Sequence, residues 1–237
     1  MFIDEIINHS KASPAEECCG FVLLNENLEV VVEPCINESL TPTDCFSISP
    51  SKFIDYSLTK KILGIYHSHP FSTERPSAYD VKSSEESGIP YIIYSLKTQK
   101  KFLYYPESYQ PSPLLQRPYV PGFYECTSLL KDYFKERLGI SIVKWNKNYW
   151  LPEDNDKANK LLNKIFSKEL KEINPKKIKK HDVIVFQIKK NARFHVGMYC
   201  GKDEFMHQPA PLLSRKEVLD ERWQKKIKRV YRHPDLV

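Results

Sequence analysis

The fold of the first half of the chain is decided by residues 64–80, which read GIYHSHPFSTERPSAYD. The apolar residues before this point predict a short strand over 62–67, and Pro70 breaks the extended chain that follows. Side chains two residues apart on a strand point the same way. His67 and His69, at the strand end, can therefore offer two imidazoles to one metal ion.

The helix that follows adds further polar groups. Ser77 begins it, Gly88 ends it, and Asp80 in its first turn can supply a third ligand. Two histidines, a carboxylate and a water make a catalytic zinc set with an open fourth position. The metal lowers the pKa of its water, and a carboxylate such as Glu17, at the start of an upstream strand, can take the proton. Ser77 can donate a hydrogen bond to the developing oxyanion.

Each residue of this set also has a simpler interpretation. Ser77 and Asp80 match a helix capping box, the two histidines alone are a weak metal signal, and Glu17 alone is an exposed acid. Together they resemble the JAMM (JAB/MPN) metalloprotease family over about residues 1–105. The family pattern is a Glu three residues before a Gly, then His-x-His-Pro, then Ser-x-x-Asp with the Asp eleven residues after the second His, and Gly20 and Asp80 fit it. The resemblance implies an α/β sandwich-like (MPN) domain that cleaves peptide or isopeptide bonds, with zinc on His67, His69 and Asp80.

The rest of the first half predicts a mixed α+β domain over residues 1–107. The expected helices cover 2–12 and 49–61, and the expected strands cover 18–24, 28–33, 91–96 and 101–105. Five prolines then lie between residues 106 and 121, which excludes a continuous helix or central strand. We therefore expect an extended linker over 108–120 and a second domain over 121–237.

The second half predicts helices followed by an antiparallel strand meander, again an α+β order. The expected helices cover 125–138 and 155–174, and the expected strands cover 182–188, 193–200, 204–207 and 227–231.

One cysteine and two histidines form a second candidate site. Cys126 lies in the first turn of a helix, whose N-terminus favours a thiolate. His195 and His207 are symmetric about Gly201, so a hairpin turning there would place them directly opposite each other, one as base and the other as its orienter. Taken singly, the cysteine is more simply a core residue, and each histidine an ordinary strand residue.

These residues resemble the NlpC/P60 cysteine peptidases over about residues 118–237. The family pattern is a Cys that starts a helix, a His-[Val/Ala]-Gly-[Ile/Met]-Tyr strand and a third polar residue twelve positions on, here Cys126, His195 and His207. Glu125 replaces the usual Asp before the cysteine, and His181 replaces the usual Gly before Asp-Val. The resemblance implies a papain-like domain, in which a helix bearing the Cys packs on an antiparallel sheet bearing the His residues. It also implies cleavage of the D-glutamate–diaminopimelate bond in peptidoglycan stem peptides.

A JAMM domain followed by an NlpC/P60 domain resembles the lambda-type tail tip assembly protein K family of long-tailed phages. Residues 213–218 (LSRKEV), Trp223 and residues 232–233 are similar to that family's ending. The resemblance implies a phage tail tip hydrolase that opens stem peptides, with a metal site that processes a tail protein. It places the protein in the virion, or in the host cytoplasm during assembly, with other tail tip or hub proteins as partners. A structural tail-tip component without required activity and a host or prophage cell-wall peptidase remain alternatives.

Composition and charge limit the other classes of protein to which the chain could belong. Residues 1–110 contain 9 basic and 15 acidic residues, whereas the remainder contains 27 and 15. The basic half can face a polyanion such as a cell wall, although a solvated surface is the simpler interpretation. No stretch approaches the ~20 apolar residues of a membrane span, and the first residues lack the apolar core of a signal peptide. We see no phosphate loop or stacking motif and expect no nucleic-acid partner.

Overall fold

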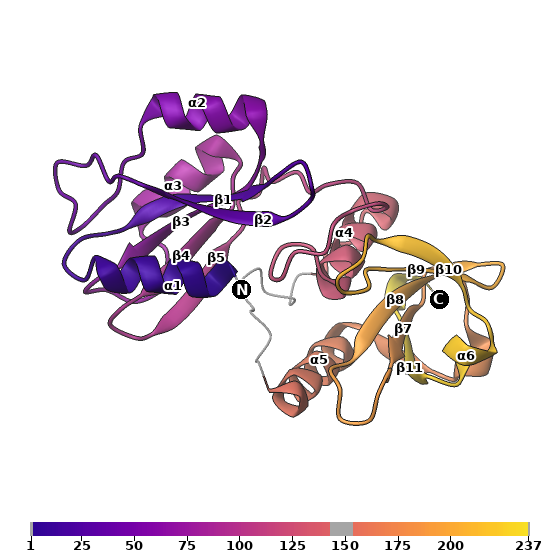
Figure 1. The fold of residues 1–237 in the computed structure, drawn as a ribbon. Coiled ribbons are helices and arrows are strands. Elements are labelled where there is room, and N and C mark those ends of the chain that lie inside the picture. The colour runs from indigo at the N-terminus through magenta and orange to yellow at the C-terminus, as the bar shows by residue number, and fades with distance from the viewer. Residues whose placement is uncertain (1, 143–153, 237) are drawn as a thin grey trace. The chain divides into compact units, whose positions relative to one another are not determined.

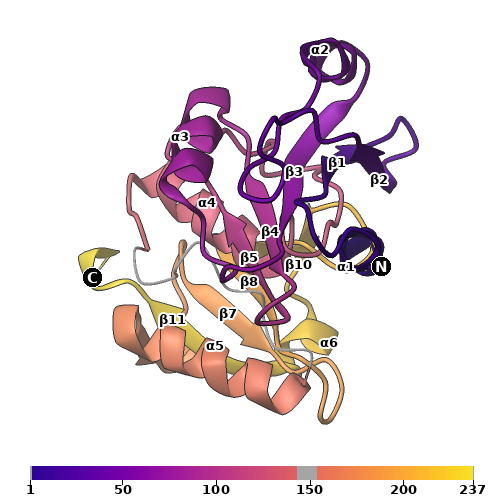
Figure 2. The same ribbon diagram turned by 90° about the vertical axis from the view of Figure 1, so that its left-hand side faces the viewer.

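The computed structural model describes residues 2–142 and 154–236, which form two compact units (Figures 1 and 2). The first unit ends at Gln110 and the second begins at Pro111. Each unit combines helices with one sheet, so the predicted α+β class is confirmed. Among the described residues, no helix has the length and apolar character needed to cross a membrane.

The first unit is built on a five-stranded mixed sheet in the order β2-β1-β3-β4-β5. Neighbouring strands are antiparallel except β3 and β4, which are parallel and are joined by helix α3. The elements are α1 Phe2–Ala12, β1 Cys19–Leu24, β2 Val30–Cys35, α2 Pro50–Thr59, β3 Lys61–His69, α3 Ala78–Ser87, β4 Tyr91–Ser95 and β5 Lys100–Tyr104. All of them were predicted from the hydrophobic pattern, with small differences at their ends.

Alternation along β3 decides which face of this sheet carries the histidines. Ile65 packs into a core cluster with Tyr56 of α2. Tyr66, which points to the other face, lies with its hydroxyl oxygen 2.8 Å from Nδ1 of His9 on α1. Helices α1 and α2 therefore cover opposite faces, as Figure 1 shows. His67 shares the face of Ile65 and so lies on the α2 side.

The second unit contains a six-stranded sheet, β10-β9-β8-β7-β11-β6, in which every pair of neighbours is antiparallel. Its helices are α4 Cys126–Leu138, α5 Asn155–Glu169 and α6 Glu221–Gln224. Its strands are β6 Lys171–Ile173, β7 Val183–Phe186, β8 His195–Gly201, β9 Glu204–His207, β10 Arg215–Val218 and β11 Ile227–Arg232.

The two faces of this sheet have separate cores. Helices α4 and α5 cover one face through Leu130 and Phe166, which pack with Val196 and Met198 of β8. The other face carries Phe186, Tyr199, Phe205 and Leu219, with Trp223 of α6 packed against them. Gly197 pairs with His207 of the neighbouring strand on this second face.

Three sequence expectations need correction in the second unit. The helix predicted over 155–174 ends at Glu169, because residues 171–173 extend to pair with β11. The prediction missed β10 and α6, because residues 215–218 and 221–224 are mostly polar and show no apolar periodicity. From Pro111 onward the expected linker is part of the second unit, since Leu114, Arg117 and Val120 are buried there.

Two candidate catalytic sites

The first candidate site lies at the end of β3, where the register of the sheet brings an upstream acid to the histidines. Cys19 of β1 pairs with His67 of β3 in an antiparallel ladder. Continuing the ladder by two residues places Glu17 opposite His69, and Oε1 of Glu17 lies 3.8 Å from Nε2 of His69. The side chains of Glu17, His67 and His69 are all buried.

Close packing of β1 on its neighbours fixes the place of Gly20. A Cβ atom there would lie 2.3 Å from the carbonyl oxygen of Glu33 and 2.7 Å from the ring of Tyr66. Only glycine fits at this distance, so the spacing from Glu17 to Gly20 follows from how the strands pack.

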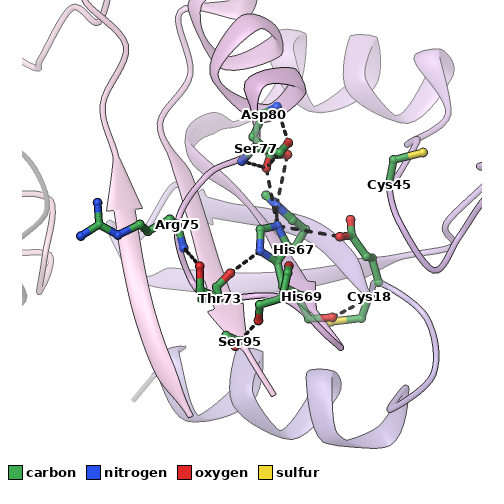
Figure 3. Close-up of polar contacts among 12 residues, drawn as sticks. Cys18, Cys45, His67, His69, Thr73, Arg75, Ser77, Asp80 and Ser95 are labelled. Carbon is green, nitrogen blue, oxygen red and sulfur yellow. Dashed lines mark hydrogen bonds and ion pairs between the residues drawn. The ribbon is translucent and has the colours of Figure 1, made fainter. Parts of the chain in front are cut away.

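Helix α3 supplies the third polar group, Asp80. The distances between the donor atoms of Asp80 and the two histidines match those around a tetrahedral metal ion. Nε2 of His67 lies 3.1 Å from Nε2 of His69 and 3.3 Å from Oδ1 of Asp80, and Nε2 of His69 lies 3.5 Å from Oδ2 of Asp80. Zinc bonds of about 2.0–2.1 Å in a tetrahedron hold ligand atoms about 3.3–3.4 Å apart. The donor set therefore fits a zinc ion in size and in type. Figure 3 shows Asp80 facing both imidazoles.

Further contacts orient these three side chains. Nδ1 of His69 lies 2.6 Å from the carbonyl oxygen of Thr73, so Nδ1 carries the proton and leaves Nε2 bare. The ring of His67 stacks on Phe46 at 4.6 Å between centroids. Phe46 and Tyr91 also line a cavity of about 360 Å³ next to His67.

Ser77 caps α3 and holds Asp80 at the same time. Its hydroxyl accepts from the Asp80 N–H at 3.1 Å and lies 2.7 Å from Oδ2 of Asp80, to which its own N–H also donates at 2.7 Å. The simpler capping-box interpretation is thus correct, and it is compatible with a metal site because the cap fixes the ligand. In this arrangement the Ser77 hydroxyl donates its hydrogen bond to Asp80.

Burial separates the two carboxylates of this site chemically. It raises the pKa of Glu17 to about 8, with Asp80 adding to the effect and His69 opposing it. Burial also works against ionisation of Asp80, but hydrogen bonds from His67 and His69 hold its pKa far below the ordinary value. Asp80 thus has the charge of a ligand, whereas Glu17 gains and loses its proton near neutral pH.

The second candidate site begins at the N-terminus of α4. Cys126 is the first residue of this helix, and its thiol lies near the backbone N–H of Val196, the residue after His195, which works to lower the thiol pKa. Glu125 takes the place of the usual Asp, and its carboxylate accepts from the Gly122 N–H at 2.6 Å. The helix start is therefore held in place despite the substitution.

The two histidines meet diagonally across the β8–β9 hairpin. His207 pairs with Gly197, and the turn consists of Lys202 and Asp203, which both have positive φ. The prediction that His195 and His207 lie directly opposite each other is therefore wrong, because the hairpin turns at Lys202 and Asp203 and not at Gly201. The rings still meet, with Nε2 of His195 2.8 Å from Nδ1 of His207, since diagonal neighbours on one face are within reach.

A second departure from the family pattern, His181, keeps the backbone of the residue that it replaces. Its φ is +77°, in the left-handed region that favours glycine. Nδ1 of His181 lies 2.8 Å from the Tyr133 hydroxyl oxygen, which gives the side chain a partner. The following residue, Asp182, is buried and forms an ion pair with Arg232 at 2.7 Å.

Three residues near His207 were not assigned a role from the sequence. Oε1 of Glu217 lies 3.3 Å from Nε2 of His207, and the same carboxylate binds Arg215 and the indole N–H of Trp223. They lie on β10 and α6, the two elements that the prediction missed. Residues 215–218 read Arg-Lys-Glu-Val and show no alternation of apolar and polar side chains, so the sequence carries no local signal for this strand.

Burial makes the resting cysteine site neutral. It raises the pKa of Cys126 to about 12, partly opposed by the backbone hydrogen bond from Val196. It lowers the pKa of His195 to about 3 and also lowers that of His207, whose shift Glu217 opposes. The helix N-terminus favours a thiolate, but burial outweighs this effect in the resting site.

Comparisons with known proteins cover both units. The model for prokaryotic homologs of the JAB domain matches residues 2–105, and the NlpC/P60 family model matches residues 116–232. The tail tip assembly protein K of Escherichia phage N15 is 27% identical over 99% of this chain and 95% of that protein. The protein of the same name from Escherichia phage lambda is 22% identical over 78% of this chain and 89% of its own length. A JAB1/MPN domain protein from Archaeoglobus fulgidus is 18% identical, with a TM-score of 0.31 over 47% of this chain and 88% of that one.

Proposed function

We propose that this chain, which belongs to the family of the phage tail tip assembly protein K, is a peptidoglycan hydrolase of the tail tip. Its second domain cleaves stem peptides of the host wall, at a bond of the D-glutamate–diaminopimelate type, so that the tail can cross. Its partners are those stem peptides and other tail tip or hub proteins, and it acts in the virion or during its assembly. The observation that carries this proposal is the 2.8 Å contact between His195 and His207, because the residue after His195, Val196, has its backbone beside the Cys126 thiol.

Chemically, the cysteine site works by general-base activation of a neutral thiol. As Cys126 attacks the carbonyl carbon of the stem peptide, its proton passes to His195, and His207 steadies the imidazolium that forms. The N-terminus of α4 stabilises charge at the sulfur during this step. His195 then gives the proton to the leaving amine, and water releases the acyl group from Cys126.

The first domain is proposed as a zinc-dependent peptidase that processes a tail or assembly protein. Zinc bound by His67, His69 and Asp80 would supply a low-pKa water and polarise the substrate carbonyl. Glu17, whose Oε1 lies 3.8 Å from Nε2 of His69, would accept the proton of the attacking water. The separations of the three donor atoms support this second activity.

Ser77 keeps its proposed second role at this site. Its hydroxyl can turn from Asp80 to the oxyanion that forms on the substrate. The aromatic cavity beside His67 offers room for an apolar side chain of the substrate.

The test of the wall activity is digestion of purified peptidoglycan sacculi by the full chain. Mass spectrometry of the released fragments would identify the bond that is cut. We expect new stem-peptide termini with the wild-type protein and none with Cys126→Ala. Release of the same termini by the variant would contradict the assignment. Absence of cleavage by both would favour a structural tail-tip component.

A further inference from the structure

A carboxylate lies behind the second histidine of the cysteine site and has no role in the chemistry above. Nε2 of His207 is buried and, in the part of the chain that the structure describes, forms no hydrogen bond of good geometry. Oε1 of Glu217 lies 3.3 Å from this atom. Because a buried N–H without an acceptor is costly, a small rotation that completes this bond is favoured.

The position of Glu217 is fixed from two sides. Nε of Arg215, on the same strand, donates to Oε1 at 2.6 Å, and the indole N–H of Trp223 donates to Oε2 at 2.9 Å. The Trp223 ring stands edge-on to His207 at 5.3 Å between centroids. The carboxylate is thus held by an arginine and a tryptophan and presents its remaining acceptor sites to the imidazole.

The order of proton donors along this chain follows from the carboxylate at its end. An ionised carboxylate only accepts, so the shared proton lies on Nε2 of His207 and Nδ1 of that ring is bare. A bare Nδ1 accepts from Nε2–H of His195 across the 2.8 Å contact. Nδ1 of His195 is then the ring atom left to take a proton.

We propose that Glu217 is a positioning residue of the cysteine site: it selects the tautomers of His207 and His195 so that Nδ1 of His195 is the unprotonated nitrogen that can act as the base for the Cys126 thiol. When the thiol proton moves to His195, the charge of the imidazolium is stabilised through His207 by the Glu217 carboxylate. No proton leaves His207 in this step, and the proton on His195 later goes to the leaving amine.

The charge state of Glu217 agrees with this role. Partial burial works to raise its pKa, but hydrogen bonds from Arg215 and Trp223 bring it below the ordinary value. The charged and titratable groups facing this carboxylate are Arg215 on its own strand and His207 on β9, and the neutral indole of Trp223 faces it from α6. Glu217 is therefore ionised at neutral pH.

The inference rests on the proposed function only for its effect on turnover, because tautomers can be read without substrate. Imidazole spectra of the ¹⁵N-labelled full chain would report which nitrogen of His207 and His195 carries the proton. We expect Nε2–H on both rings in the wild type. In Glu217→Leu, which removes the acceptor at similar size, the Nε2–H population of His207 should fall.

Turnover of sacculi provides the second readout. We expect Glu217→Leu to lower kcat by about tenfold or more with KM nearly unchanged, in the range that loss of an outer partner of a histidine costs. Glu217→Gln keeps an acceptor oxygen without the charge, so its kcat should lie between those of the wild type and Glu217→Leu. This variant also replaces the leucine variant in the test if the latter folds poorly. The matched control is Glu204→Gln on β9, whose carboxylate pairs with Lys216 away from both histidines.

A double-mutant cycle separates positioning from a structural role. If Glu217 acts through His207, its replacement should change kcat little in a His207→Ala background. Two results would overturn the inference: a wild-type His207 protonated at Nδ1, or a Glu217 effect that persists undiminished without His207. Uncleaved sacculi together with the expected tautomers would instead reject the proposed substrate and leave the positioning role intact.

Discussion

At the scale of single residues, burial governs the chemistry of Cys126 and His195. Both side chains are partly exposed, and they lie at the start of helix α4 and the start of strand β8. Burial of their polar atoms still raises one pKa to about 12 and lowers the other to about 3. The pair is therefore uncharged at neutral pH.

This charge state predicts the pH dependence of thiol reactivity. For an acid with a raised pKa, the reactive thiolate grows about tenfold per pH unit at every pH below that value. We expect alkylation of Cys126 by iodoacetamide to accelerate steadily from pH 5 to pH 9 in the folded protein. Quantifying the Cys126 peptide by mass spectrometry would measure it, with the urea-denatured chain as reference. A rate that is already high and flat at acidic pH would indicate a preformed thiolate–imidazolium pair instead.

At the scale of elements, helix starts position the groups of both sites. Helix α3 begins at a capping box whose Asp80 is also a candidate metal ligand, and α4 begins at Cys126. The register of the strands positions the remaining groups, since pairing of β1 with β3 brings Glu17 close to His69. Pairing of β8 with β9 likewise brings His207 within reach of His195.

Ser77 both caps α3 and holds the candidate ligand Asp80, and these two roles can be tested against a second helix cap. Ser77→Ala should destabilise the protein by about 1 kcal/mol, the usual value of an N-cap, and should also weaken zinc binding because Asp80 loses two contacts. Asp154→Ala removes the N-cap of α5, which accepts from the Lys157 N–H at 2.8 Å, and should cost similar stability without affecting zinc. Thermal unfolding and competition with a zinc chelator would compare them. Equal zinc affinity in the two variants would reject the link between cap and ligand.

At the scale of the whole molecule, each candidate site lies within its own compact unit. Glu17, His67, His69 and Asp80 all belong to the first unit, and the cysteine site with Glu217 belongs to the second. The charge difference follows the same division, since the acidic excess lies before residue 111 and the basic excess after it. Two separate reactions are therefore expected from one chain.

Separation of the two activities is the corresponding prediction. In the full chain, His67→Ala and His69→Ala should lose bound zinc, as measured by elemental analysis, yet release stem-peptide termini from sacculi at the wild-type rate. Glu17→Ala should also leave wall cleavage unchanged, and Cys126→Ala should keep its zinc. Loss of wall cleavage in Glu17→Ala would contradict this division between the domains.

The sequence by itself determined the local features of this protein and the types of residue in each site. Periodicity predicts the strands and long helices because apolar residues must face a core, and Ser77, Gly88 and Gly139 mark helix ends because their chemistry suits caps. The spacings from Glu17 to Gly20, from His69 to Asp80 and from His195 to His207 indicated two sites through their resemblance to family patterns. These signals are local, and local preference is what a sequence reports directly.

Only the tertiary structure decided the features that depend on distant pairing. The diagonal meeting of His195 and His207 depends on a register shift, and the end of α5 at Glu169 depends on β6 pairing with β11. The position of Glu217 behind His207 requires β10 to pair with β9. The pKa values of the thiol and imidazole depend on how deeply the folded chain buries them. None of these can be obtained from neighbouring residues, because each is set by contacts between segments far apart in the chain.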